Sequence, residues 1–163
     1  MNDFSEKDFT KLIEKMRGEA GVDLSTAEDL SLAVMNLISL EEHFFFTASK
    51  TGKPEYFDMA GKVREVRKES MKRLIGEHEG ETWCATKHLL AATMRLIEVG
   101  NKLNSDGKKE EARKTYVEAY QVYSIFWALK LKLVDVKAVV PAKGDKPLSV
   151  EDLVTKLADC CSE

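Results

Sequence analysis

Residues that break helices are scarce in this chain of 163 residues, which contains only 3 Pro and 9 Gly. Ala, Leu, Glu, Lys, Met and Arg fill the long segments between them. These residues lose little freedom in a helix, so the composition favours helices over strands. We therefore expect an all-α protein, and at this length a single domain over residues 1–163.

The chain also lacks features that would point to particular partners or compartments. Its 25 Lys and Arg are balanced by 28 Asp and Glu, so we expect no basic surface for nucleic acid. The longest nearly apolar run, LSLAVMNLISL, is far shorter than the roughly 20 residues that cross a bilayer. No secretory signal is apparent at the N-terminus, and 3 Cys are too few for a disulfide framework. The sequence predicts a soluble cytoplasmic protein that binds neither nucleic acid nor membranes.

Four long helical segments are separated by connections of only a few residues. Short connections between long helices force neighbours to run antiparallel. We therefore predict a four-helix antiparallel up-down bundle with short extra N- and C-terminal helices. The expected long helices cover residues 25–49, 54–78, 81–105 and 108–132, followed by a connector at 133–147 and a terminal helix at 149–161, with a short helix near 5–17 at the start.

One pair of neighbouring segments carries a familiar spacing of small and apolar residues. Residues 93–126 resemble a single tetratricopeptide-type helical hairpin, and no second copy occurs. The resemblance implies a closely packed pair of helices in which Gly and Ala permit close approach. The residues that carry it are Leu96, Val99, Gly100, Leu103, Ala112, Tyr116 and Ala119.

Core positions can be predicted from steps of three and four residues along each segment. A charged residue interrupts the expected apolar row in two of them, Glu41 in the first long segment and Arg67 in the second. The fourth long segment carries an aromatic row that we expect in the core. The expected rows are Leu30, Val34, Leu37, Glu41, Phe44 and Ala48; Ala60, Val63, Arg67, Met71 and Leu74; Ala85, Leu89, Ala92, Leu96, Val99 and Leu103; and Tyr116, Tyr120, Tyr123 and Trp127.

A less apolar column runs beside the row of the third long segment, formed by Cys84, His88, Ala91, Arg95 and Glu98. Counting residues from each turn places the charged groups of this column level with those of the preceding segments. Buried charges need partners, and Arg pairs well with carboxylates. Glu41, Arg67, Arg95 and Glu98 are therefore expected either to form a structural network of ion pairs or to line a pocket for a small polar or anionic ligand.

The lower end of the same column suggests a metal site as a further alternative. Cys84 and His88 are four residues apart on one helix, and His78 is close in sequence. Thiolate and imidazole are both zinc ligands, so zinc or another divalent metal would be the cofactor. The competing interpretation is a buried structural thiol and a hydrogen-bonded histidine.

Three consecutive phenylalanines, Phe44, Phe45 and Phe46, span about 200° of their helix at 100° per residue. This is too wide for one core face, so one of them is a candidate contact for a protein partner or a second copy of the chain. We predict a non-enzymatic helical interaction or scaffold protein. The alternative is a bundle that binds a small ligand or a metal on the 84–98 column.

Overall fold

A computed structural model describes residues 24–76 and 81–131, and all the regular structure in these ranges is helical. The expected short helices near 5–17 and at 149–161, the connector and His78 lie outside the described residues. None of the described helices combines the length and apolarity needed to cross a bilayer. The four helices are α2 (Leu24–Thr51), α3 (Glu55–Ile75), α4 (Thr82–Ser105) and α5 (Lys109–Lys130).

The helix boundaries follow from turn chemistry. Pro54 has φ −66° and is the N-cap of α3, where its missing N–H costs nothing. The same helix ends at Ile75, against the expected residue 78. Gly76 takes φ +63°, a conformation that glycine adopts easily, and its N–H donates to the carbonyl of Lys72.

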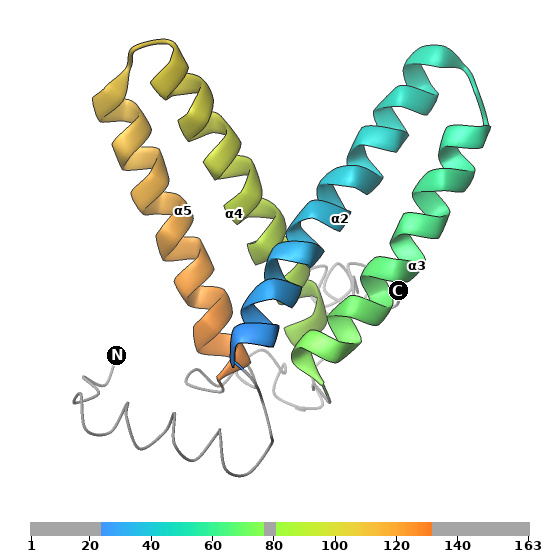
Figure 1. The fold of residues 1–163 in the computed structure, drawn as a ribbon, viewed down its shortest axis with the longest axis horizontal. Helices are drawn as coiled ribbons and strands as arrows, with labels where there is room; N and C mark the ends of the chain where they lie inside the picture. The colour runs from blue at the N-terminus through green and yellow to red at the C-terminus, as the bar shows by residue number, and fades with distance from the viewer. Residues whose placement is uncertain (1–23, 77–80, 132–163) are drawn as a thin grey trace, which may run out of the picture.

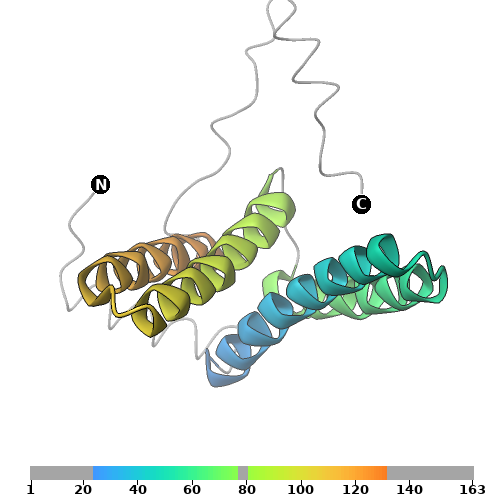
Figure 2. The same cartoon turned by 90° about the horizontal axis from the view of Figure 1, so that it is seen from above.

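The helices are paired as two hairpins, α2 with α3 and α4 with α5, in each of which the second helix returns beside the first (Figure 1). The hairpins converge at the end that holds the start of α2 and the end of α5. They diverge towards their turns, so that the described residues form a V (Figure 1). The view from above also shows two separate pairs (Figure 2). The principal contact between them is α2 against α4.

The apolar core lies where the hairpins converge, and we refer to this region as the base. Each of the four helices contributes at least one fully buried side chain there, including Val34, Leu74, Leu90 and Phe126. The ring of Phe126 stacks on that of Tyr123, with 5.7 Å between centroids. The Tyr123 hydroxyl lies 2.7 Å from the hydroxyl of Ser31 on α2, which ties α5 to the first hairpin.

Above the base, each hairpin is an arm two helices thick. The α4/α5 arm is closely packed because Gly100 lies under the ring of Tyr116: a Cβ at Gly100 would be 2.7 Å from Tyr116 Cδ1. The tyrosine hydroxyl donates to Asn101 Oδ1 at 2.8 Å and fixes the ring. Small buried side chains on α5, Ala112, Thr115 and Ala119, complete the interface.

The expected core rows agree better with the first hairpin than with the second. Val34, Ala48, Met71 and Leu74 are buried as expected, whereas the expected row of α4 is wrong in part: Val99 is exposed. Counting only apolar residues missed the packed face of α4, because small and polar side chains make up much of it. Tyr120, expected in the core, is 73% exposed. The buried residues of α4 are Trp83, Cys84, Thr86, Leu90, Thr93 and Gly100.

Candidate functional site

Residues of the predicted column on α4 lie along the region where α4 meets α2. Cys84 is buried in the base. Higher on α4, His88 and Ala91 line a groove with α2 and α3, whereas Arg95 and Glu98 line a second groove with α2. The column thus extends from the core of the base to residues that line the two grooves beside α2.

Glu41 and Arg67 form the most buried ion pair among the described residues. Arg67 Nε donates to Glu41 Oε1 at 2.5 Å, and the two side chains are 2% and 21% exposed, respectively. Arg67 Nη1 also contacts Met71 Sδ at 3.5 Å. Because Arg67 is buried and Glu41 is largely shielded from water, loss of one partner leaves the other poorly compensated.

The predicted group of four charged residues is divided between the two sides of α2. Arg95 donates to Glu98 on its own helix and to Glu42 on α2, and all three side chains are about half exposed. Exposed pairs of this kind stabilise a fold by less than about 1 kcal/mol. Glu42 was missed by counting levels along the chain. Its position one residue after Glu41 could have indicated it, since a step of 100° turns it from α3 towards the next helix.

The groove between α2, α3 and α4, which we call the α2/α3/α4 groove, has a volume of about 500 Å³. Its α2 wall includes Glu41, Glu42 and Phe45, which lie within about one turn of each other. The α3 wall includes Gly61 and Arg64. This volume lies within the roughly 300–1,000 Å³ of ordinary ligand sites.

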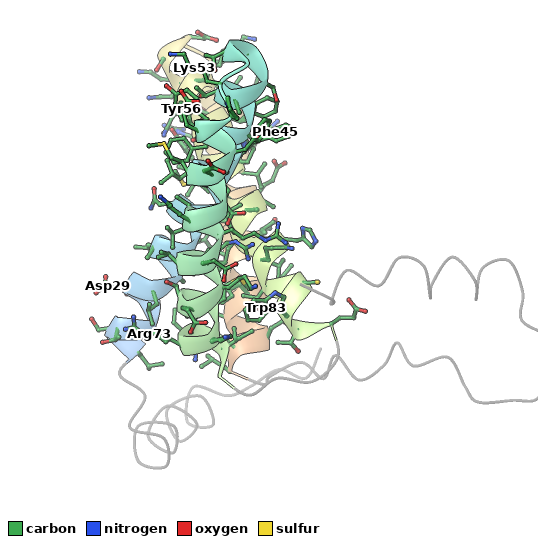
Figure 3. All side chains as sticks on the ribbon, turned by 90° about the vertical axis from the view of Figure 1, so that its right-hand side faces the viewer. Asp29, Phe45, Lys53, Tyr56, Arg73 and Trp83 are labelled. Atoms are coloured by element: carbon green, nitrogen blue, oxygen red, sulfur yellow. The ribbon has the colours of Figure 1, made fainter. Side chains whose placement is uncertain are left out.

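The opposite wall of the same groove belongs to α4 and carries Lys87 and His88. Figure 3 looks at the α2/α3 arm from its outer side. Phe45 projects from one flank of this arm, and Tyr56 lies on the other flank (Figure 3). Trp83 lies on the same flank as Phe45, nearer the base. The groove therefore opens on the flank of the arm that faces the start of α4.

The two described members of the predicted metal site, Cys84 and His88, lie in different surroundings. Cys84 is buried and packs among apolar side chains of the base, whereas His88 is exposed one turn above it. Within residues 24–76 and 81–131, no three His, Cys, Asp or Glu side chains are grouped to hold a metal ion. A metal site that includes His78 stays a prediction, because that residue lies outside these ranges.

Exposed aromatic rings gather on the α2/α3 arm. Phe45, Phe46 and Phe57, which we call the phenylalanine cluster, are each about half exposed. The centroid of Phe45 lies 5.3 Å from that of Phe46 and 6.3 Å from that of Phe57, both in edge-to-face geometry. Phe44, by contrast, stacks on Tyr56 across the hairpin. Of the three consecutive phenylalanines, one therefore serves the hairpin and two remain exposed.

Comparison of the chain with family models, with curated proteins and with solved structures gives no significant match. Function has to be argued from the grooves, the charged pairs and the phenylalanine cluster.

Proposed function

We propose that the chain is a non-enzymatic helical interaction protein whose contact surface is the phenylalanine cluster of the α2/α3 arm. The single observation that supports this is the exposure of Phe45, Phe46 and Phe57, each about half accessible, with the ring of Phe45 in contact with the other two. A buried aromatic side chain removes about 150–250 Å² from water, at about 25 cal/mol per Å². Covering such a cluster is therefore a substantial driving force for association.

The finer features of the proposal concern the arrangement of helices. The antiparallel up-down bundle expected from the sequence would be completed in the complex, with a helix from a protein partner or a second copy beside the α2/α3 arm. Aromatic anchors surrounded by polar residues are typical of interfaces in which a few side chains contribute most of the binding energy.

Site-specific photo-crosslinking tests the proposal. A photoreactive phenylalanine analogue replaces Phe57 in the full chain, expressed in its native cells, and the matched control replaces exposed Lys114 on α5. We expect a discrete protein adduct of defined mass from position 57 and none from position 114. Absence of an adduct at position 57, or equal labelling at both positions, contradicts the interaction function.

A second candidate function is binding of a small polar or anionic ligand. The observation that favours it is the α2/α3/α4 groove, which Glu41 and Arg67 both line. In the predicted set, Arg95 and Glu98 would belong to the adjoining groove on the other side of α2. Mass spectrometry of the purified chain under native conditions, with Glu41→Gln as the control variant, would reveal a retained small molecule that the variant loses. Absence of a bound small molecule from the unsubstituted chain, or its equal retention by both proteins, would remove this candidate.

A further inference from the structure

A glycine in the interior of α3 is not explained by packing among the described residues. Gly61 lies in the α2/α3/α4 groove, and a Cβ placed on it would meet no heavy atom within 4 Å. Glycine inside a helix costs about 0.5–1 kcal/mol relative to alanine. Gly100, the other glycine in the interior of a described helix, is covered by Tyr116. The comparison indicates that Gly61 keeps a surface open for close approach from outside.

The shape of the groove indicates what approaches. Ile38 and Phe45 on α2 are seven residues apart, so this wall runs for two turns, about 10 Å along the helix. Gly61 and Ala60 form a low wall on α3, and Ala91 does the same on α4. Helix axes approach to about 8 Å only where the contacting side chains are small. Small side chains on the α3 and α4 walls, beside one exposed ring on α2, fit a fourth helix laid in the groove.

The charges of the groove select the kind of helix. Its walls carry Arg64, Arg67 and Lys87 against Glu41 and Glu42, and Glu42 is also paired with Arg95. Arg67 is itself paired with Glu41, and the five lining side chains together carry a formal charge of +1. Arg64 and Lys87 come from different helices, so the positive charge lies on both sides of the groove. Complementary charge at the edge of an interface raises the association rate and disfavours wrong partners.

We infer that the α2/α3/α4 groove is the seat of one amphipathic helix from a partner protein. The apolar face of that helix packs over Phe45 and Gly61, and Asp or Glu residues beside this face meet Arg64 and Lys87. This inference rests on the proposed interaction function and specifies its partner.

Two synthetic probes test the inference with the full chain. The first is a fluorescently labelled 20-residue amphipathic helix with a leucine face flanked by glutamates, and the second has lysines in place of the glutamates. Fluorescence anisotropy at low salt measures their binding. We expect the glutamate peptide to bind at least about tenfold more tightly, with an affinity that falls as salt is added. Equal affinities, or no binding of either peptide, would overturn the inference.

Substitutions in the chain test whether the peptide binds in the groove. Gly61→Leu fills the low wall, and we expect it to abolish binding while the helical circular dichroism is unchanged, because the residue is exposed. Arg64→Glu and Lys87→Glu should each weaken the glutamate peptide about tenfold, whereas Lys114→Glu on α5 should not. Unchanged binding by Gly61→Leu would overturn the inference. An adduct at position 57 without binding of the acidic peptide would refute only the partner class, whereas loss of both would refute the interaction function too.

Discussion

In the α4/α5 hairpin, Gly100 lies under the ring of Tyr116, whereas in the α2/α3 hairpin Gly61 faces a groove that the described residues leave open. Both glycines interrupt the interior of a long helix. The first permits two helices of the same chain to approach closely. The second has no such role within the described residues, and the groove in which it lies is lined by the exposed ring of Phe45 and by charged side chains. Two hairpins of similar length therefore use the same residue type differently: Gly100 serves internal packing, and Gly61 serves the external contact that we infer.

The hairpins share the base, where we expect the largest effect of a substitution. Phe126 is fully buried there, so Phe126→Ala should lower the free energy of unfolding by about 3–5 kcal/mol. Phe46→Ala on the α2/α3 arm removes a half-exposed ring and should cost less than about 1 kcal/mol. Chemical denaturation of both variants measures the difference. Similar losses would mean that the exposed cluster is as important for the fold as the base.

Within the α2/α3 hairpin, the ion pair between Glu41 and Arg67 comes next. Arg67→Met leaves Glu41 without this partner and should cost about 3 kcal/mol in urea denaturation. The double variant Glu41→Leu with Arg67→Met should recover most of the loss, since an apolar pair replaces a buried ionic one. Arg95→Met, which breaks only exposed pairs, should cost less than about 1 kcal/mol. If Arg95→Met lowered the free energy of unfolding as much as Arg67→Met, the distinction between a buried pair at Arg67 and exposed pairs at Arg95 would be contradicted.

The two glycines should respond to alanine with opposite signs. Gly100→Ala brings a methyl group against the fixed ring of Tyr116 and should lower stability by about 1 kcal/mol, because the strain exceeds the gain in helix propensity. Gly61→Ala meets no neighbour within 4 Å and should raise stability by about 0.5–1 kcal/mol. Thermal unfolding of the pair provides the measurement. A destabilising Gly61→Ala would show that this glycine is needed by the fold itself.

The smallest expected effect is at Lys130, in the last turn of α5. Partial burial of its ammonium group lowers the pKa of Lys130 below the usual 10.5. The unfolded chain holds this proton more tightly, so stability should increase as pH rises from the lowered pKa towards 10.5. Lys130→Met should therefore raise stability at neutral pH by less than about 1 kcal/mol, and this advantage should shrink over the same pH interval. If the stability gained by Lys130→Met did not depend on pH, the gain would come from packing and not from the lowered pKa of Lys130.

The sequence predicted the helical class well because helix formers dominate and the turns carry glycine or proline. It also placed Glu41 and Arg67 on the apolar rows of α2 and α3, where their pairing follows from the high cost of an isolated buried charge. The α4/α5 interface was harder to predict. Thr86, Thr93 and Gly100 are buried on α4 although none of them is strongly apolar, so an apolar pattern selected a neighbouring face.

The grooves could not be derived from helix periodicity. Counting levels along antiparallel helices assumes that neighbours remain side by side, whereas α2 and α4 diverge above the base (Figure 1). Phe45 stays exposed above the base, and Arg95 pairs with Glu42 where α4 still lies close to α2. Crossing directions depend on the summed shape of many side chains, and no single residue encodes them.

The most direct measurement is the separation of the two hairpin tips. Nitroxide labels at Lys53, beside the α2/α3 turn, and at Lys108, beside the α4/α5 turn, can be followed by pulsed electron paramagnetic resonance in the full chain. Two hairpins joined at their base predict a distance well beyond the roughly 8–10 Å between the axes of packed neighbouring helices. A distance distribution centred near a single helix spacing would contradict the open arrangement and, with it, the groove as a seat for a partner helix.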